Sequence, residues 1–294
     1  VCFSQQAEVI ATGSVTGVYY PLGGAIANII SGKVEGLLVT VESTGGSVAN
    51  IRMVQKGDVA FAFAGATTCY NLFDGKPPYE KEPAPSIRAI AALYPEVLQI
   101  VVRKDSGLKT FDDLKGKRVG LGAPGSGTAF STERILNAHG ITVKDFRVEY
   151  LDFAECVTAL KDRNIDAGVI FAGAPTAAVM DLWSTVDLDI LQLGPSLMEN
   201  KEFLEQFLKE NPFYTISTIP AGVYEKLDYD VLTIAVPAVM ITHEDFDEGM
   251  VYEVTKAIFE NLDVIGQSHV QGKNVSLENA TGGVPIPFHP GAEK

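Results

Sequence analysis

The sequence predicts an α/β protein built of two similar lobes, and three observations carry this prediction. Short apolar runs alternate with segments whose apolar residues recur at helical spacing, in the order strand, turn, helix, strand. This order appears in both halves of the chain, which favours parallel strands joined by right-handed helical crossovers. Each half also carries a glycine-rich turn between a strand and a helix, at residues 13–17 and 125–128.

The bulk composition limits the classes of protein. With 294 residues, the chain is long for one core and short for three. A hydrophobic content of 46% with 20% charged residues is that of an ordinary soluble globular protein. No apolar run reaches the ~18 residues that a membrane span requires. The formal net charge of −14 argues against a nucleic-acid partner but not against a small anion, which backbone N–H groups can bind.

The first lobe is expected to contain three strands and two helices. The strands are expected at 8–12, 37–41 and 58–63, and the helices at 20–30 and 48–56. A proline-rich surface excursion at 77–85 leads to extended segments at 87–93 and 98–102. Tyr94-Pro95-Glu96 is expected to separate these two segments.

The second lobe is expected to repeat the scheme. Its strands are expected at 118–121, 147–151 and 167–172, and its helices at about 129–138 and 154–163. A helix at 201–209, a β-rich run at 233–241, a helix at 250–261 and a surface tail at 281–291 follow. The chain is expected to cross between the lobes near 94–104 and again near 233–241, which predicts a two-strand hinge. Lobe one then comprises residues 1–98 and 237–294, and lobe two comprises residues 99–236.

The glycine-rich turns are candidate anion sites. A strand that ends in such a turn and opens a helix leaves backbone N–H groups pointing outward, with the positive end of the helix dipole behind them. A third such turn lies at 44–47. The hydroxyls of Ser126 and Thr128 have a plainer interpretation as helix N-caps. Three such turns, two of them at matching places in similar units, favour a clamshell protein that closes on a small acid.

Three short segments partly match catalytic or nucleotide-binding patterns. The run Gly120–Gly125 matches the dinucleotide pattern G-x-G-x-x-G, with Asp152 after the next strand, but Pro124 lacks an N–H that a pyrophosphate would use. The same turn resembles a phosphate-binding loop, but Thr128 stands where the lysine must be. Residues 45–49 nearly match a nucleophile elbow.

No metal site, catalytic site or cofactor is expected. The four histidines have no metal-ligand spacing and are expected at the surface; they are His139, His243, His269 and His289. Cys69 and Cys156 are expected to be buried free thiols. The chain begins at Val1 without a basic-then-apolar leader, which predicts a mature form whose signal peptide has been removed. Lipidation of Cys2 is not expected, because Val1 fits the processing site poorly.

At this point a family resemblance becomes visible along the whole chain. The segments that carry it, in order, are 9–13, 16–23, 43–48, 93–96, 101–107, 114–119, 122–128, 172–175 and 289–293, among them Tyr19-Tyr20-Pro21, Ser43-Thr44-Gly45-Gly46-Ser47, Leu93-Tyr94-Pro95-Glu96 and Gly125-Ser126-Gly127-Thr128. These segments resemble the TAXI family, the solute-binding proteins of tripartite ATP-independent periplasmic (TRAP) transporters.

The resemblance implies a type II periplasmic-binding-protein fold, in which two βα lobes joined by a two-strand hinge hold a ligand in the cleft between them. It implies a periplasmic receptor that delivers its ligand to an ion-gradient-driven TRAP permease of fused small and large subunits. A monomer is expected because a carrier must open and close, and no enzyme activity is expected because no group of residues makes a convincing active site. The implied ligand is a glutamate- or glutamine-like amino acid or a 2-oxo or hydroxy dicarboxylate. Glu42, Glu96 and backbone carbonyls are all candidate acceptors for an amine, so the sequence does not decide whether the ligand carries one.

The ligand-binding residues implied by the resemblance come from both lobes. They are Ser14, Thr16, Gly17, Val18, Tyr19, Ser47, Ala64 and Tyr94 in lobe one, and Ser126, Gly127, Thr128, Gly173 and Ala174 in lobe two. Arg88 and Arg103 lie near the crossings and are secondary candidates. A receptor for an ABC importer or a sensor kinase would share this fold and is the alternative; a dinucleotide-binding enzyme is a further one.

Overall fold

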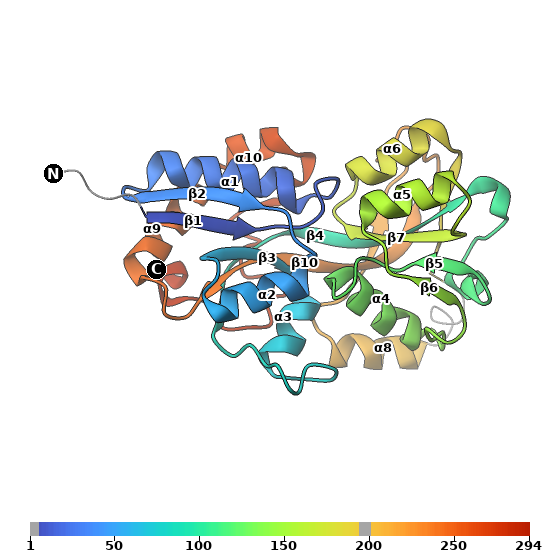
Figure 1. Ribbon diagram of the computed structural model, residues 1–294, viewed down its shortest axis with the longest axis horizontal. Helices are drawn as coiled ribbons and strands as arrows, with labels where there is room; N and C mark the ends of the chain where they lie inside the picture. The colour runs from blue at the N-terminus through green and yellow to red at the C-terminus, as the bar shows by residue number, and fades with distance from the viewer. Residues whose placement is uncertain (1–5, 194–200) are drawn as a thin grey trace. The chain divides into compact units, whose positions relative to one another are not determined.

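The computed structural model describes residues 6–193 and 201–294, so Cys2 lies outside the described residues. The chain divides into two compact units (Figure 1): unit 1 is Val1–Pro95 with Pro237–Lys294, and unit 2 is Glu96–Val236. Two strands, β4 (Ile87–Arg103) and β10 (Val231–His243), each run from one unit into the other. Among the described residues, no helix combines the length and apolar character needed to cross a bilayer.

Unit 1 is a mixed sheet with helices on both faces. Its elements are β1 (Gln6–Ala11), α1 (Tyr19–Lys33), β2 (Leu37–Glu42), α2 (Ser47–Lys56), β3 (Phe61–Gly65), α3 (Ala66–Phe73), α9 (Glu248–Phe259), α10 (Leu262–Ser268), the 3₁₀ turn η3 (Val270–Asn274) and α11 (Pro290–Glu293). The strand order is β2-β1-β3-β10. β1 is parallel to both β2 and β3, with Ile10 opposite Val41 and Phe61, whereas β10 is antiparallel to β3.

The core of unit 1 follows from helical and strand periodicity. Helix α1 packs with α9 and α10, and α2 packs with α3 on the other side of the strands (Figure 1). Ile26 and Ile30 lie one turn apart on α1 and are fully buried. Helix α1 approaches the end of β1 so closely that a Cβ at Gly23 would lie 2.7 Å from the Thr12 methyl group, so this position requires glycine.

Unit 2 repeats the arrangement. Its elements are η1 (Lys104–Ser106), η2 (Phe111–Leu114), β5 (Arg118–Gly120), α4 (Gly127–Ala138), β6 (Arg147–Glu149), α5 (Phe153–Lys161), β7 (Ala167–Ala172), α6 (Ala177–Thr185), β8 (Leu188–Ile190), α8 (Lys201–Glu210) and β9 (Thr215–Ile219). β5 is parallel to β6 and β7, β4 is antiparallel to β7, β8 adds to β4, and β9 adds to β10. The predicted α/β class is therefore confirmed, with mixed rather than purely parallel strands.

Two glycines in the unit 2 strands allow a helix to pack closely. A Cβ at Gly120 would lie 2.6 Å from the Cys156 sulfur, and one at Gly168 would lie 2.9 Å from a Leu160 methyl group. Both contacted side chains belong to α5. Gly120 lies in β5, as expected, and Asp152 forms the capping box of α5 with Glu155. Gly120 and Asp152, which suggested a dinucleotide site, therefore serve the close packing and the capping of α5.

The prediction of two extended segments separated by Tyr94-Pro95-Glu96 was wrong, because β4 is continuous from Ile87 to Arg103. The strand changes partners at Pro95. Before it, Ala92 N–H donates to the Ala280 carbonyl, and after it Val97 pairs with Ala172. A proline without an N–H is tolerated where the ladder changes partners, so the strand continues through it.

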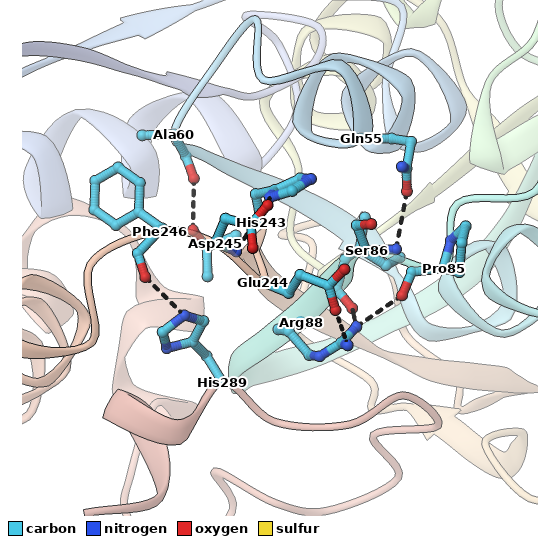
Figure 2. A network of polar contacts seen from close by, with 12 residues as sticks. Gln55, Ala60, Pro85, Ser86, Arg88, His243, Glu244, Asp245, Phe246 and His289 are labelled. Atoms are coloured by element: carbon cyan, nitrogen blue, oxygen red, sulfur yellow. Dashed lines mark hydrogen bonds and ion pairs between the residues drawn. The ribbon is translucent and has the colours of Figure 1, made fainter.

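The tail is exposed at residues 281–283, 287 and 290, as expected, but its other residues attach it to the unit 1 core. Phe288 forms a parallel bridge to Ala89, and Ile286 is 4% exposed. His289 is 1% exposed: its Nδ1 accepts the Gly291 N–H at 3.2 Å, and its Nε2 lies 3.1 Å from the Phe246 carbonyl (Figure 2). These two contacts require the neutral ring with its proton on Nε2, since Nδ1 acts as an acceptor.

Acid is expected to weaken this tail contact. Burial lowers the pKa of His289 below its usual 6.5. The unfolded chain therefore binds the proton more readily, and the stabilisation present above about pH 6.5 is lost as the pH falls through the folded-state pKa. We expect the fall in unfolding free energy between pH 7.5 and 5, measured by urea titration, to be smaller in His289→Gln than in the unchanged protein. Identical pH profiles would contradict this assignment.

Candidate functional site

Two loops and one direct strand-to-helix junction of unit 1 meet at one edge of its sheet. Because β1, β2 and β3 are parallel, their carboxyl ends lie together, and the segments after them start from that edge. We call it the carboxyl edge of unit 1, and define it as residues 12–18, 43–47 and 65–68. The predicted residues Ser14, Thr16, Gly17, Val18 and Ser47 all lie in these segments.

Asn50 ties these segments together, and sequence reasoning missed it. Its side chain is 0% exposed, on the buried face of α2. Its Nδ2 donates to the carbonyls of Thr12 at 2.6 Å and Phe63 at 2.7 Å, and lies 3.3 Å from that of Ala11. The Thr44 hydroxyl lies against its Oδ1. A polar residue between Val48 and Ile51 on a buried helix face is the signal that could have identified it.

The first predicted turn folds on itself. The Gly17 N–H donates to the Ser14 carbonyl at 3.0 Å, and the hydroxyls of Ser14 and Thr16 lie 3.0 Å apart. Both hydroxyl residues are half-buried. Nearby, Ser43 and Thr44 donate to the carbonyls of Gly13 and Thr12 at 2.8 and 3.0 Å. The first two loops are therefore joined through side chains as well as through the sheet.

Three helices start at the carboxyl edge without a side-chain cap. The N-caps are Val18 for α1, Gly46 for α2 and Gly65 for α3, and none of the three helices has an acidic residue in its first turn. By contrast, α5 and α9 are capped by Asp152 and Asp247. In a chain of net charge −14, the carboxyl edge keeps helix N-terminal N–H groups available to an outside anion.

Ser47 and three aromatic rings complete this part of unit 1. The Ser47 hydroxyl accepts the Gly65 N–H at 3.1 Å, which joins the start of α2 to that of α3. The Tyr19 ring meets Phe63 edge-on at 5.4 Å and Tyr94 at 6.5 Å between centroids, so the predicted Tyr19 and Tyr94 are brought together. Ala64 is fully buried in β3, opposite Val239.

In unit 2, the predicted residues follow the neighbouring parallel strands β5 and β7. Ser126 is the N-cap of α4, and its hydroxyl accepts the Ala129 N–H at 3.1 Å. Gly127 and Thr128 are the first residues of that helix. The turn is tight, because a Cβ at Gly122 would lie 2.8 Å from the Ser126 hydroxyl oxygen. The interpretation of Ser126 as a helix N-cap is thus correct. The Thr128 hydroxyl does not cap the helix.

Gly173 and Ala174 lie in the loop after β7, and a buried polar chain supports that loop. The Thr176 N–H donates to the Tyr224 hydroxyl at 3.0 Å, and this hydroxyl donates to Gln99 Oε1. Gln99 Nε2 in turn donates to the Ala172 carbonyl at 3.2 Å. Burial raises the pKa of Tyr224 to about 12, so its proton stays in place. Sequence reasoning missed Tyr224 and Gln99, which lie far from the loop in sequence.

The two secondary arginine candidates are held by acidic partners. Arg88 pairs with Glu244 and donates to the Pro85 carbonyl at 2.8 Å (Figure 2). Arg103 forms a two-point contact with Asp105, at 3.0 and 2.6 Å. Of the amine-acceptor candidates, Glu42 is exposed and Glu96 is 8% exposed. The carboxyl edge of unit 1 itself contains no lysine or arginine.

The expectation of surface histidines was wrong for two of the four. His139 is 6% exposed and His289 is 1% exposed. His139 Nδ1 donates to the Ile135 carbonyl at 2.9 Å, and burial lowers its pKa. Cys69 and Cys156 are buried free thiols, as predicted, and burial raises the pKa of Cys156 to about 12, which leaves it protonated and unreactive. Within residues 6–193 and 201–294, no cluster of metal-ligating side chains occurs.

Known proteins resemble this chain both in sequence and in fold. The sequence family described as the NMT1-like family matches residues 10–294. A solved structure from Bordetella bronchiseptica RB50 is 21% identical, has a TM-score of 0.56, and is matched over 97% of this chain and 85% of its own.

Two further solved structures carry informative names. A putative L-cystine ABC transporter protein from Listeria monocytogenes is 14% identical with a TM-score of 0.56, over 93% of this chain and 99% of its own. PhnD1 from Prochlorococcus marinus, solved with methylphosphonate, is 17% identical with a TM-score of 0.54, over 92% of this chain and 91% of its own. These likenesses show that the predicted fold, that of periplasmic binding proteins, is correct; the hinge and the ligand cleft stay predictions.

Proposed function

We propose, from the premise that this chain belongs to the NMT1-like family, that it is a periplasmic solute-binding receptor that captures a small anion and delivers it to a membrane transporter. The observation that carries this proposal is the carboxyl edge of unit 1, where three helices begin without side-chain caps or acidic residues. A bound anion would accept hydrogen bonds from those N–H groups, each charge-assisted bond contributing about 1.5–3 kcal/mol. The names of the structural relatives, a cystine transporter protein and a methylphosphonate complex, support small polar ligands.

The proposed ligand contacts are those that the sequence predicted. In unit 1 they are Ser14, Thr16, Gly17, Val18, Tyr19, Ser47, Ala64 and Tyr94, and in unit 2 Ser126, Gly127, Thr128, Gly173 and Ala174. Ser14, Thr16 and Thr128 offer half-buried hydroxyls, whereas Ser126 contributes its place in the turn rather than its hydroxyl, which caps α4. We propose a carboxylate such as a glutamate-like amino acid or a 2-oxo dicarboxylate as the ligand.

A thermal-shift screen tests the proposed function. Protein that has been unfolded and refolded to remove any carried ligand is screened against amino acids, dicarboxylates, 2-oxo acids, methylphosphonate, cystine and nucleotides. A ligand at a thousandfold excess over its Kd stabilises the folded state by about 4 kcal/mol, which raises Tm by several degrees. A shift with a small acid supports the proposal. A response to nucleotides alone, or to no small acid, would contradict it.

Thr128→Ala is expected to weaken binding of the acid found in that screen by about 1–2 kcal/mol, because one hydrogen bond to the ligand is lost. Titration calorimetry measures the change directly. Thr158→Ala is the control, since the Thr158 hydroxyl donates to the Ala154 carbonyl within α5, at 3.1 Å. Equal affinities of Thr128→Ala and the unchanged protein would remove Thr128 from the site.

We propose an ABC importer as the membrane partner, because the named structural relative is an ABC transporter protein. The TRAP permease remains a second candidate because of the sequence resemblance to the TAXI family. Ligand uptake into cells that carry the receptor and its transporter separates the two. Uptake that stops when ATP is depleted but survives collapse of the ion gradients supports an ABC importer. The reverse pattern supports a TRAP permease and would overturn the ABC assignment.

A further inference from the structure

Two threonines in the first turn of α3 are buried without hydrogen-bond partners. Thr67 and Thr68 are both 0% exposed, and neither hydroxyl oxygen has a partner in the structure. Buried hydroxyls are nearly always satisfied in folded proteins, so two adjacent exceptions call for an explanation. In a helix interior, a threonine hydroxyl ordinarily bonds a carbonyl of the preceding turn. At the second and third positions of α3, the preceding residues belong to β3, so no such helical turn precedes them.

These side chains belong to the first turn of a helix that has no capping side chain. Helix α3 runs from Ala66 to Phe73 directly after β3, with Gly65 as N-cap, no capping side chain and no acid in its first turn. The N–H groups of the first turn of a helix have no partner within the helix. The Thr67 and Thr68 side chains branch from that same turn. Hydroxyl and N–H donors are thus concentrated at the positive end of the helix dipole.

The start of α2 is joined to the same place. Ser47, the first residue of α2, is 6% exposed, and its hydroxyl accepts the Gly65 N–H at 3.1 Å. This bond uses the lone pair of Ser47 and leaves its own proton available for donation. A side-chain hydrogen bond also stabilises the first turn of α3, because Asn71 Nδ2 donates to the Thr67 carbonyl at 2.7 Å. These bonds hold the backbone at the starts of α2 and α3 in place before any ligand arrives.

We propose that Thr67 and Thr68, with the N-terminal N–H groups of α3 and the Ser47 hydroxyl, form the specificity-determining oxyanion site for the head group of the ligand. This inference rests on the proposed function, and it adds two residues that the sequence did not indicate. The head group is an anion with two or three oxygens on one centre, a chemistry that carboxylates, phosphonates and sulfonates share. Neutral donors alone recognise it, since neither first turn contains a lysine or arginine.

Replacement of each threonine by valine tests the site, because valine keeps the shape and removes only the hydroxyl. The probes are L-glutamate, 2-oxoglutarate, methylphosphonate and methanesulfonate, titrated by calorimetry into the unchanged protein, Thr67→Val and Thr68→Val. We expect each variant to bind the responding probe about tenfold or more weakly. Without ligand, we expect each variant to melt no lower than the unchanged protein, since no hydrogen bond of the free protein is lost.

Two further variants make the outcome decisive. Thr242→Val is the control: Thr242 is also 0% exposed in unit 1, but its hydroxyl donates to the Ala60 carbonyl at 2.8 Å. This control should lower Tm and leave affinity unchanged. Thr67→Ser and Thr68→Ser keep a hydroxyl and should restore affinity; failure of serine to restore it overturns the inference.

The remaining outcomes separate this inference from the proposed function. If the unchanged protein binds a probe and both valine variants bind it equally well, the inference is overturned and the proposed function stands. If the unchanged protein binds none of the four probes and no small acid in the thermal-shift screen, both are overturned. The probe that responds identifies which oxyanion is held.

Discussion

Asn50→Asp is expected to lower the unfolding free energy by about 3–5 kcal/mol at pH 7, the range observed when a buried charge is left uncompensated. The Asn50 amide group points its two protons at the carbonyls of Thr12, Phe63 and Ala11, from a position that is fully buried. A carboxylate there has no proton to donate and repels all three carbonyl oxygens. Urea titration at pH 7 measures the loss, and a change below about 1 kcal/mol would show that Asn50 does not hold the loops.

The pH dependence of the same variant provides a second measurement. Burial among carbonyls should raise the pKa of the new carboxyl above the ~3.9 of an unfolded aspartate. The folded variant then binds the proton more readily than the unfolded chain, so lowering the pH restores part of the lost stability relative to the unchanged protein. Asn261→Asp is the matched control: Asn261 donates to one carbonyl, that of Ala257 at 2.7 Å, and is only half-buried. Its loss should be much smaller.

The arrangement of strands was largely predictable because its signals are local. The order strand, glycine turn, helix correctly located β1, β2, β5 and β7, and the helices that follow β1, β2 and β5. The short helix α3 was missed because β3 passes into it at Gly65 without a turn, so no break in the apolar run marks its start. Local pattern cannot show such a transition when strand and helix are both buried.

Features that depend on distant partners were not predictable. The continuity of β4 through Pro95 relies on pairing with Ala172 on one side and on the Ala280 carbonyl on the other. The tail was expected on the surface because proline and glycine dominate it, but Phe288 and His289 pack against β4 and the loop after β10. The two buried histidines were misjudged for the same reason, since burial is decided by elements remote in sequence.

The site was predictable in its backbone and less so in its side chains. The glycine turns at 13–17 and 44–47 correctly indicate the uncapped helix starts at Val18 and Gly46, but the uncapped start of α3 at Gly65 was missed, and the helix after the turn at 125–128 is capped. The sequence could not show which hydroxyls are already used, and Ser126 proves to be a cap. It also could not show Asn50, Thr67 or Tyr224, whose importance lies in what surrounds them rather than in a motif.

Tyr224→Phe is expected to lower the unfolding free energy by about 2–4 kcal/mol, the second largest effect we expect from a single side chain. The ring contact with Trp183, 5.7 Å between centroids, is kept, so the change isolates the hydroxyl. Its loss leaves the Thr176 N–H and the Gln99 amide oxygen buried without this partner, and each such group costs about 1–3 kcal/mol. Urea titration measures the effect on stability.

Tyr229→Phe is the matched control for this prediction, since Tyr229 makes a similar pair of contacts at a more solvent-exposed position. Its hydroxyl accepts the Ile190 N–H at 3.2 Å and lies 3.3 Å from Asp189 Oδ1, and the side chain is only half-buried, so water can replace it. We expect a loss below about 1 kcal/mol there. Because Tyr224 supports the loop that contains Gly173 and Ala174, its phenylalanine variant should also bind the ligand more weakly, whereas the control should not. Equal losses of stability in the two variants would show that the buried chain from Gln99 to Thr176 has no special role in holding that loop.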